Sequence, residues 1–100
     1  MVEGAGDLLA EVVAELRTKF WGIYRGVVTD TVDPLGLERV RLIVPAVTGP
    51  EQTGWAPACV PVGGVADGMA ALPPVGAGVW VQFEVGDPGY PVWVGVMRTP

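Results

Sequence analysis

VWVQFEVGDPGYPVWVGV, residues 79–96, is the stretch that decides the fold of this chain. Two apolar runs rich in valine and aromatic residues flank Gly86-Asp87-Pro88-Gly89, a cluster of residues that favour turn dihedral angles. The pattern predicts a β-hairpin in which Val85 pairs with Tyr90. We therefore expect the domain to be built around this hairpin.

The predicted register sorts the hairpin side chains onto two faces. Phe83 and Val94 fall on a wholly apolar face, whereas Trp80 and Trp93 fall on the opposite face, which would ordinarily be solvated. Pro91 lacks the N–H that a central strand donates, so it predicts a sheet edge or a bulge in the second strand. Outward tryptophans beside an edge indicate a docking surface; the alternative is that both rings pack under the N-terminal segment of the same chain.

The helical pattern in the sequence runs from Asp7 to Phe20 (DLLAEVVAELRTKF). Asp7 is the predicted N-cap, and Glu15 lies four residues before Lys19, a spacing that stabilises helices. Apolar residues recur at the spacing of one helix face, namely Leu9, Val12, Val13, Leu16 and Phe20. The pattern predicts an amphipathic helix whose apolar face either covers one open end of the domain or docks on a neighbouring subunit.

Residues 21–32 and 37–47 predict a second hairpin around the turn Asp33-Pro34-Leu35-Gly36. In the predicted register Val27 faces Leu42, Val28 faces Arg41, Thr29 faces Val40 and Asp30 faces Arg39. Residues 54–62 are a further strand candidate, interrupted by two prolines, and residues 63–74 form a long connection with room for a helical turn at 69–72.

The composition is that of one folded domain. Half of the 100 residues are hydrophobic and only 17% are charged, while Gly 15 and Pro 10 imply many turns and short strands. The elements together predict an all-β fold, a small five-stranded OB-fold-like Greek-key barrel in residues 21–97, preceded by one short N-terminal amphipathic helix in residues 1–20. An SH3-like barrel is the alternative.

Cellular location is constrained by three features of the sequence. Cys59 is the single cysteine, so an intramolecular disulfide is excluded, which fits a reducing compartment. No apolar run approaches the roughly 20 residues of a membrane span, and the N-terminus is acidic where a signal peptide would be basic. We expect synthesis in the cytoplasm and no membrane insertion by this chain alone.

The residues that usually carry catalysis are scarce. The chain has no His and no Ser, which excludes a Ser-His-Asp triad and the commonest metal ligand. Cys59 has no recognisable activating partner and is expected to be a buried structural thiol. Asp33 and Asp87 each precede a proline in a turn, where a carboxylate ordinarily accepts backbone N–H bonds. The sequence thus predicts a protein that is not an enzyme, with no catalytic, cofactor-binding or metal-binding residues.

Nucleic-acid binding is the alternative function, because many OB barrels combine a basic groove with stacking aromatic residues. The chain has aromatic residues in its strands, but its net charge is −5 and its pI is about 4.4. Five of the six basic residues lie between positions 17 and 41, so any basic patch is local. A surface that follows phosphates needs clustered Lys and Arg, so we expect no nucleic-acid partner.

Residues 21–96 closely resemble the OB-fold domain of contractile-tail spike proteins. That family comprises phage baseplate assembly protein V, the N-terminal domain of tail-associated lysozymes, and the VgrG proteins of type VI secretion. The most specific matches are the D-P-x-G turn with R-V-R-x-x-V-P at residues 39–45, and P-x-V-G-x-x-V-W-V-x-F-E-x-G-D-P-x-Y-P-V-W-V-G at residues 73–95. The needle and lysozyme regions of that family have no counterpart in these residues, and the N-terminal helix is not part of the match.

The resemblance implies a structural baseplate or spike-region component of a contractile injection apparatus, either a phage tail or a related secretion or tailocin-like particle. It implies a homotrimer around the tube axis, acting as an axial adaptor between a hub or tube and a needle or tip, and located in the virion tail or the assembled particle. The interface candidates are Leu9, Val12, Val13, Leu16, Phe20, Trp80 and Trp93.

Overall fold

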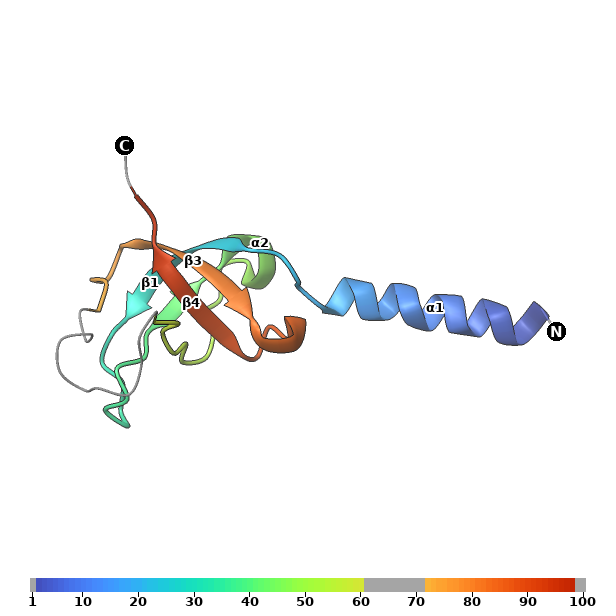
Figure 1. Cartoon of the computed structure of the whole chain (residues 1–100), viewed down its shortest axis with the longest axis horizontal. Coiled ribbons are helices and arrows are strands. Elements are labelled where there is room, and N and C mark those ends of the chain that lie inside the picture. The colour runs from blue at the N-terminus through green and yellow to red at the C-terminus, as the bar shows by residue number, and fades with distance from the viewer. Residues whose placement is uncertain (1, 61–71, 99–100) are drawn as a thin grey trace.

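The computed structural model describes residues 2–60 and 72–98, with residues 2–5 described by their backbone alone. A long helix, α1, projects from a β domain, so that the molecule measures 60 × 29 × 28 Å (Figure 1). The helical turn predicted at residues 69–72 falls outside the described residues except for Leu72. In chain order the elements are α1 (Val2–Thr18), β1 (Tyr24–Asp30), β2 (Arg41–Ile43), α2 (Pro45–Thr48), β3 (Gly78–Phe83), the 3₁₀ turn η1 (Glu84–Gly86) and β4 (Pro91–Val96).

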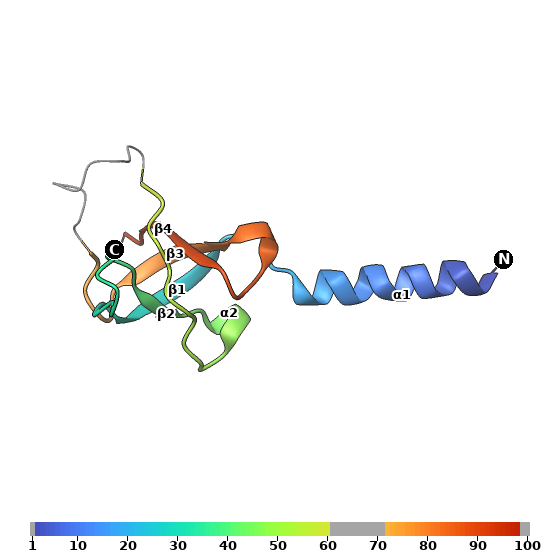
Figure 2. The same ribbon diagram turned by 90° about the horizontal axis from the view of Figure 1, so that it is seen from below.

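The strands form one antiparallel sheet in the order β2-β1-β3-β4. A segment without regular strand structure then links the two edges of this sheet. Near β2, Val40 and Ala56 exchange backbone hydrogen bonds of 3.1 and 2.7 Å. On β4, the Trp93 N–H donates to the Pro57 carbonyl at 3.1 Å, and the Trp93 carbonyl accepts from the Cys59 N–H at 2.9 Å. Figure 2 shows this segment in yellow-green, after α2.

Four strands are formed in the described residues where the sequence predicts five. Residues 54–60, the described part of the fifth strand candidate, make only isolated bridges to Val40 and Trp93. Pro57 has no N–H to donate, so a continuous ladder cannot form through it. An antiparallel four-stranded sheet with a helix at its N-terminus is consistent with an OB-type domain.

The β3–β4 pairing begins as predicted and then shifts by one residue. Val79 pairs with Val96 and Trp80 with Gly95, but the register changes at the next step, so that Val81 pairs with Trp93. The extra residue on β4 is Val94, which forms a β-bulge. Because side chains alternate along a strand, this insertion turns Trp93 into the core, where it is 8% exposed. The predicted outward position of Trp93 is therefore wrong.

The hairpin loop explains why the register shifts. The predicted four-residue turn would pair Val85 with Tyr90, but the loop is longer and includes η1. The Glu84 N–H donates to the Tyr90 carbonyl at 3.0 Å, and the Asp87 N–H donates to the Glu84 carbonyl at 2.9 Å. Val85 lies inside this loop with φ +52°, a left-handed conformation that a β-branched residue rarely adopts. The bulge in β4 compensates for the longer loop.

The β1–β2 pairing is also shifted from the predicted register. Val28, not Val27, pairs with Leu42, and Asp30 pairs with Arg41 across an irregularity. Val28 is consequently buried, while Val27 is 41% exposed. The predicted pairing of Asp30 with Arg39 is wrong because the Arg39 side chain is bonded to Asp33 in the connecting loop.

The core lies between the sheet and the linking segment 52–59. At Gly26 on β1 the packing is tight, because a Cβ atom there would lie 2.8 Å from Cγ2 of Val81. The small residue therefore allows β1 to approach the core closely. The buried hydrophobic residues are Val28, Val40, Leu42, Val44, Ala56, Val79, Val81, Phe83 and Trp93.

Helix α1 begins earlier and ends earlier than the sequence predicts. It starts at Val2, so Asp7 lies within the helix and is not its N-cap. It ends at Thr18, whose hydroxyl donates to the Glu15 carbonyl at 3.1 Å, with Arg17 in the last turn, where a cation complements the helix dipole. The helix points away from the sheet (Figure 1), so it does not cover an open end of the domain in this chain.

The bulge predicts losses of stability of very different size at two neighbouring residues of β4. Trp93→Ala should lower the free energy of unfolding by about 3–5 kcal/mol, because it leaves a large cavity in the core. Val94→Ala, at a half-buried position on the other face, should cost about 1 kcal/mol or less. Urea denaturation of the two variants measures both values, and equal losses would contradict the bulged register.

Candidate interaction surfaces

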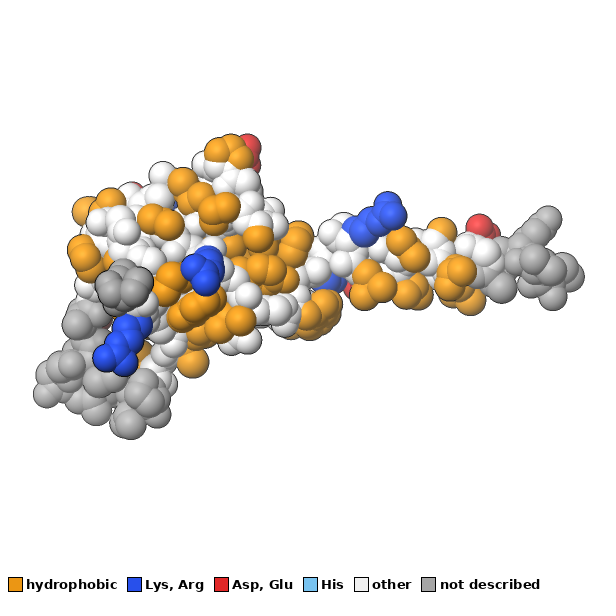
Figure 3. Space-filling view, turned by 90° about the horizontal axis from the view of Figure 1, so that it is seen from above, with side chains coloured by type: hydrophobic (Ala, Val, Ile, Leu, Met, Phe, Trp, Pro, Cys, Tyr) orange, Lys and Arg blue, Asp and Glu red, His pale blue; other side chains and the backbone are white. Residues whose placement is uncertain are grey.

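One face of α1 is an uncovered apolar surface, which we call the helix stripe. Its exposed fractions range from 40% at Val13 to 68% at Leu9. Figure 3 shows hydrophobic side chains along the helix on the viewed side. The helix stripe consists of Leu9, Val12, Val13 and Leu16, four of the five residues predicted to share a helix face. A stripe this exposed on a soluble helix is typical of an interaction site.

Phe20, the fifth residue of the predicted face, belongs to the β domain instead. It lies beyond the end of α1 and is half-buried against the core, with its ring centroid 6.1 Å from that of Tyr24 and 6.2 Å from that of Phe83. Its N–H donates to the Gly86 carbonyl at 2.7 Å. Phe20 therefore joins the helix to the domain and is separated from the helix stripe.

Next to this joint, the domain presents apolar residues that the sequence did not single out. Trp21 packs on Gly86, where a Cβ atom would lie 3.0 Å from the indole ring. Val85 and Tyr90 are exposed in the β3–β4 loop beside it. We call Trp21, Val85 and Tyr90 the proximal surface. Turns usually carry polar residues, so apolar residues next to this turn were the feature of the sequence that could have indicated the proximal surface.

Trp80 lies on the outer face of the sheet, as predicted. The Arg25 guanidinium lies 5.4 Å from the centroid of its ring, a cation–π contact between neighbouring strands. Half-buried Val92 and Val94 and the exposed Val27 share this outer face. Trp93 is not part of it, so the predicted pair of outward tryptophans is reduced to Trp80.

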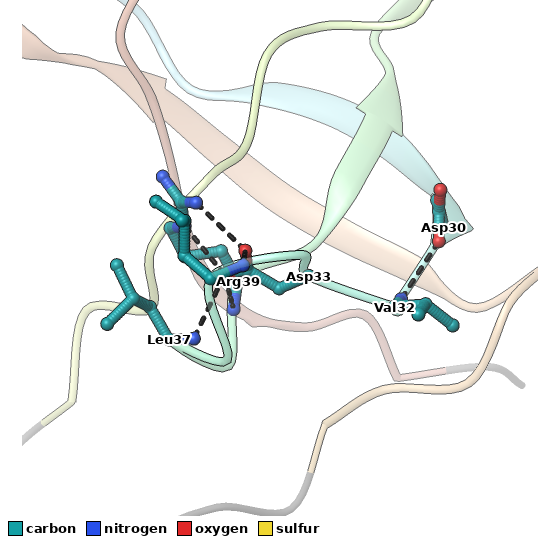
Figure 4. A network of polar contacts seen from close by, with 6 residues as sticks. Asp30, Val32, Asp33, Leu37 and Arg39 are labelled. Carbon is teal, nitrogen blue, oxygen red and sulfur yellow. Dashed lines mark hydrogen bonds and ion pairs between the residues drawn. The ribbon is translucent and has the colours of Figure 1, made fainter.

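The loop between β1 and β2 is organised by Asp33 (Figure 4). Arg39 donates from Nε to Oδ2 at 2.7 Å and from Nη2 to Oδ1 at 2.9 Å. The N–H groups of Leu35 and Leu37 donate to the same carboxylate at 2.9 and 3.2 Å. The Asp33 side chain is thereby almost completely covered. The hydrogen bonds from the Arg39 side chain hold the pKa of the Asp33 carboxyl well below its ordinary value of 3.8.

The polar network at Asp33 turns the apolar side chains of its loop outward. Val32, Leu35 and Leu37 are each more than half exposed, and so is Val75 in the loop that leads into β3. These four residues, which we call the distal surface, belong to the β1–β2 loop and to the segment before β3, and both segments lie at the end of the domain opposite α1 (Figure 1). The Asp-Pro pattern predicts only a turn at this loop, so the exposed apolar surface was not expected from the sequence.

Among the residues that the structure describes, the cysteine and the carboxylates form no recognisable catalytic group. Cys59 is exposed, so the expectation of a buried thiol is wrong. In the described part of the chain, no group of three Cys, Asp or Glu side chains is placed to hold a metal ion. Asp33 accepts backbone N–H bonds, as predicted from its place before a proline, and Asp87 accepts one from Gly89 at 2.8 Å. Within residues 2–60 and 72–98, no helix is long and apolar enough to cross a membrane.

Comparison with known proteins gives one family. Residues 24–97 match the family model described as the type VI secretion system/phage-baseplate injector OB domain. No curated protein matches the chain. The matched residues include the proximal residues Val85 and Tyr90, the whole distal surface and the outer face of the sheet, but α1 and its stripe lie outside the match.

The network at Asp33 predicts a pH-dependent stability. Because the folded pKa is lowered, the contribution of this carboxylate to stability is complete above its ordinary pKa and is lost progressively as the pH falls from that value toward the lowered folded pKa. Asp33→Asn should therefore lower the melting temperature by several degrees at pH 7, and the difference from the natural chain should shrink toward pH 2.

Asp87→Asn is the matched control, because Asp87 occupies the same type of turn without an arginine partner in the described contacts. Thermal melts of both variants between pH 2 and 7 make the measurement. An equal and pH-independent loss in the two variants would show that the Arg39 pairing contributes nothing.

Proposed function

The chain belongs to the family of type VI secretion system and phage-baseplate injector OB domains, and from this we propose that it is a structural component of a contractile injection apparatus. The observation that carries the proposal is the family match over residues 24–97. The apparatus is a phage tail or a related secretion or tailocin-like particle. The chain would be made in the host cytoplasm and incorporated into the virion tail or the injection particle.

Within the particle, we propose that the chain is an axial adaptor between a hub or tube and a needle or tip. The support is the presence of exposed apolar side chains at both ends of the β domain. The proximal surface has Trp21 and Tyr90, and the distal surface has Leu35 and Leu37. A protein that stacks between two neighbours along an axis needs a contact surface at each end, and aromatic residues are enriched in such contacts.

Around the axis, we propose a homotrimer. The outer face of the sheet supports lateral contacts, because Val27, Trp80 and Val94 leave apolar area uncovered between the edges of the sheet. A closed ring of identical subunits repeats one contact around a rotation axis, so a single such face suffices for three copies. The VgrG-like spike proteins that the chain resembles imply this arrangement.

We propose that the role is mechanical and that the chain does not act as an enzyme. Without His or Ser, the sequence lacks the commonest general base and the hydroxyl nucleophile of most hydrolases. Asp33, the carboxylate with the most strongly shifted pKa, is occupied by Arg39 and by backbone N–H groups. Its partners are those of a turn, so it is not free to act as an acid or base.

An OB-fold nucleic-acid-binding module is the alternative function, and one observation favours it. Arg41 lies 5.8 Å from the ring centroid of Trp55, and Arg25 lies 5.4 Å from that of Trp80, so cations sit beside aromatic rings on the surface. However, Arg41 donates to the Thr53 carbonyl at 3.1 Å and Arg39 is paired with Asp33. These contacts, with a net charge of −5, leave little positive charge for a phosphate backbone.

The structural proposal is tested by substitutions at the two ends of the domain. Leu35→Gln and Val85→Asn should fold normally, because both side chains are exposed and Asn tolerates the left-handed backbone at position 85. Each variant should be recovered in purified particles at least tenfold less than the natural chain. Glu51→Gln, an exposed change on the side of the domain, is the control and should be incorporated normally. Normal recovery of both end variants would overturn the adaptor role.

The nucleic-acid alternative is tested with labelled single-stranded DNA and RNA. We expect no change in fluorescence anisotropy at physiological salt with up to tens of micromolar protein. A salt-sensitive dissociation constant in the micromolar range or tighter, weakened by Arg41→Gln, would replace the structural proposal with a nucleic-acid module.

A further inference from the structure

Helix α1 has an apolar face that the described residues 2–60 and 72–98 leave uncovered. An isolated helix of its length, 17 residues, is only marginally stable in water, and most helices in proteins are stabilised by packing of an apolar face. The helix stripe is 40–68% exposed, so the β domain does not provide this packing. Among residues 2–60 and 72–98, therefore, nothing covers the helix stripe, and it is open to packing against a second molecule.

The spacing within the helix stripe indicates what kind of partner fits it. Leu9 and Leu16 are seven residues apart, and Val12 lies between them at the spacing of the second core position of a heptad. Val13 and Leu8 extend the apolar face on either side. Leucine at the first core position with a β-branched residue at the second favours coiled coils of more than two helices. A wide apolar face also favours bundles of more than two helices.

Charges on the two sides of the stripe indicate the orientation of the partner. On a helical projection Glu15 borders the stripe on one side and Arg17 borders it on the other. In parallel helices around a common axis, the Glu15 side of one helix faces the Arg17 side of the next. In an antiparallel pair, the Glu15 side of one helix faces the Glu15 side of its partner, so the two acidic sides meet. The two sides of one helix are thus complementary to each other in a parallel arrangement.

We infer that α1 associates with α1 of two further copies of this chain in a parallel three-helix bundle. The bundle buries the helix stripe of each copy and forms a stem on the β domains. The number of copies in this inference rests on the proposed function, which places three subunits around the axis. The bundle adds a contact that the matched OB domain does not contain. An anionic membrane surface is disfavoured as the occupant, because residues 1–20 carry four acidic and two basic residues.

The first test measures the mass of the full-length chain by light scattering at about 100 µM. We expect three times the mass of one chain. The variant Leu9→Gln/Leu16→Gln keeps good helix formers but removes the apolar stripe, and its mass should fall by at least half with an unchanged melting temperature of the β domain. A monomeric natural chain, or a variant that keeps the full trimer mass, would overturn the bundle.

The second test distinguishes parallel from antiparallel association by disulfide cross-linking. In a Cys59→Ala background, Leu16→Cys brings two thiols together only if the helices are parallel, because residue 16 lies near one end of α1. Ala14→Cys, at nearly the same height on the opposite side, is the matched control. We expect covalent dimers on a denaturing gel for Leu16→Cys alone, and equal yields for the two variants would contradict the proposal.

The third test uses the charges. Glu15→Arg and Arg17→Glu should each weaken association severalfold by placing like charges together, and the double exchange should restore it. No recovery in the double variant would refute the proposed pairing of the two sides.

Particle incorporation separates this inference from the proposed function. A Leu9→Gln/Leu16→Gln chain that is monomeric but still incorporated at the natural level would show that assembly does not need the stem. A trimeric natural chain that is absent from particles would leave the bundle standing and remove the adaptor role.

Discussion

The β domain depends on the burial of Trp93 by the bulge at Val94. The indole fills the core opposite Val81, while the backbone of the same residue holds the segment that crosses from the other edge of the sheet. Its N–H donates to Pro57 and its carbonyl accepts from Cys59, so one residue provides both packing and edge pairing. The two roles reinforce each other, because backbone hydrogen bonds at a sheet edge are stronger when side chains exclude water from them.

The segment that links the two sheet edges limits which surfaces remain for other molecules. With both edges partly paired, the free areas are the outer face around Trp80, the loops at the two ends and the helix stripe on α1. The Asp33 and Asp87 turns lie at opposite ends of the domain and follow the same Asp-Pro pattern. Only the Asp33 turn has an arginine partner in the described contacts, and its side chains Leu35 and Leu37 point outward on a rigid support. The chain belongs to the family of type VI secretion system and phage-baseplate injector OB domains, and the proposed axial contacts would use these apolar ends.

Helix α1 extends beyond the β domain and is not part of its core. A β domain with a covered core can be stable alone. A helix of this length with an exposed apolar face is only marginally stable unless that face packs against another element. In the proposed bundle, the free energy that orders α1 comes from association, so folding of the helix is coupled to assembly. In the proposed axial adaptor, this coupling makes the rigidity of the stem depend on the presence of all its subunits.

The elements with strong local causes could be predicted from the amino-acid sequence. The Asp-Pro turns, the apolar strand runs, the carboxylate of Asp33 as an acceptor of backbone N–H groups and the stripe of Leu9, Val12, Val13 and Leu16 were all predictable, because turn dihedrals and helical spacing act within a few residues. The resemblance to the family could be recognised for the same reason, because it rests on short sequence motifs that occur in the expected order.

The strand registers and the faces on which side chains lie depended on contacts between residues that are distant in sequence. A one-residue bulge exchanged the places of Trp93 and Val94, and loop length rather than composition produced it. Phe20 left the helix face because it packs with Tyr24 and Phe83, which are distant in sequence. Whether an amphipathic helix covers its own domain or another molecule is not encoded in its periodicity, since both solutions require the same apolar stripe.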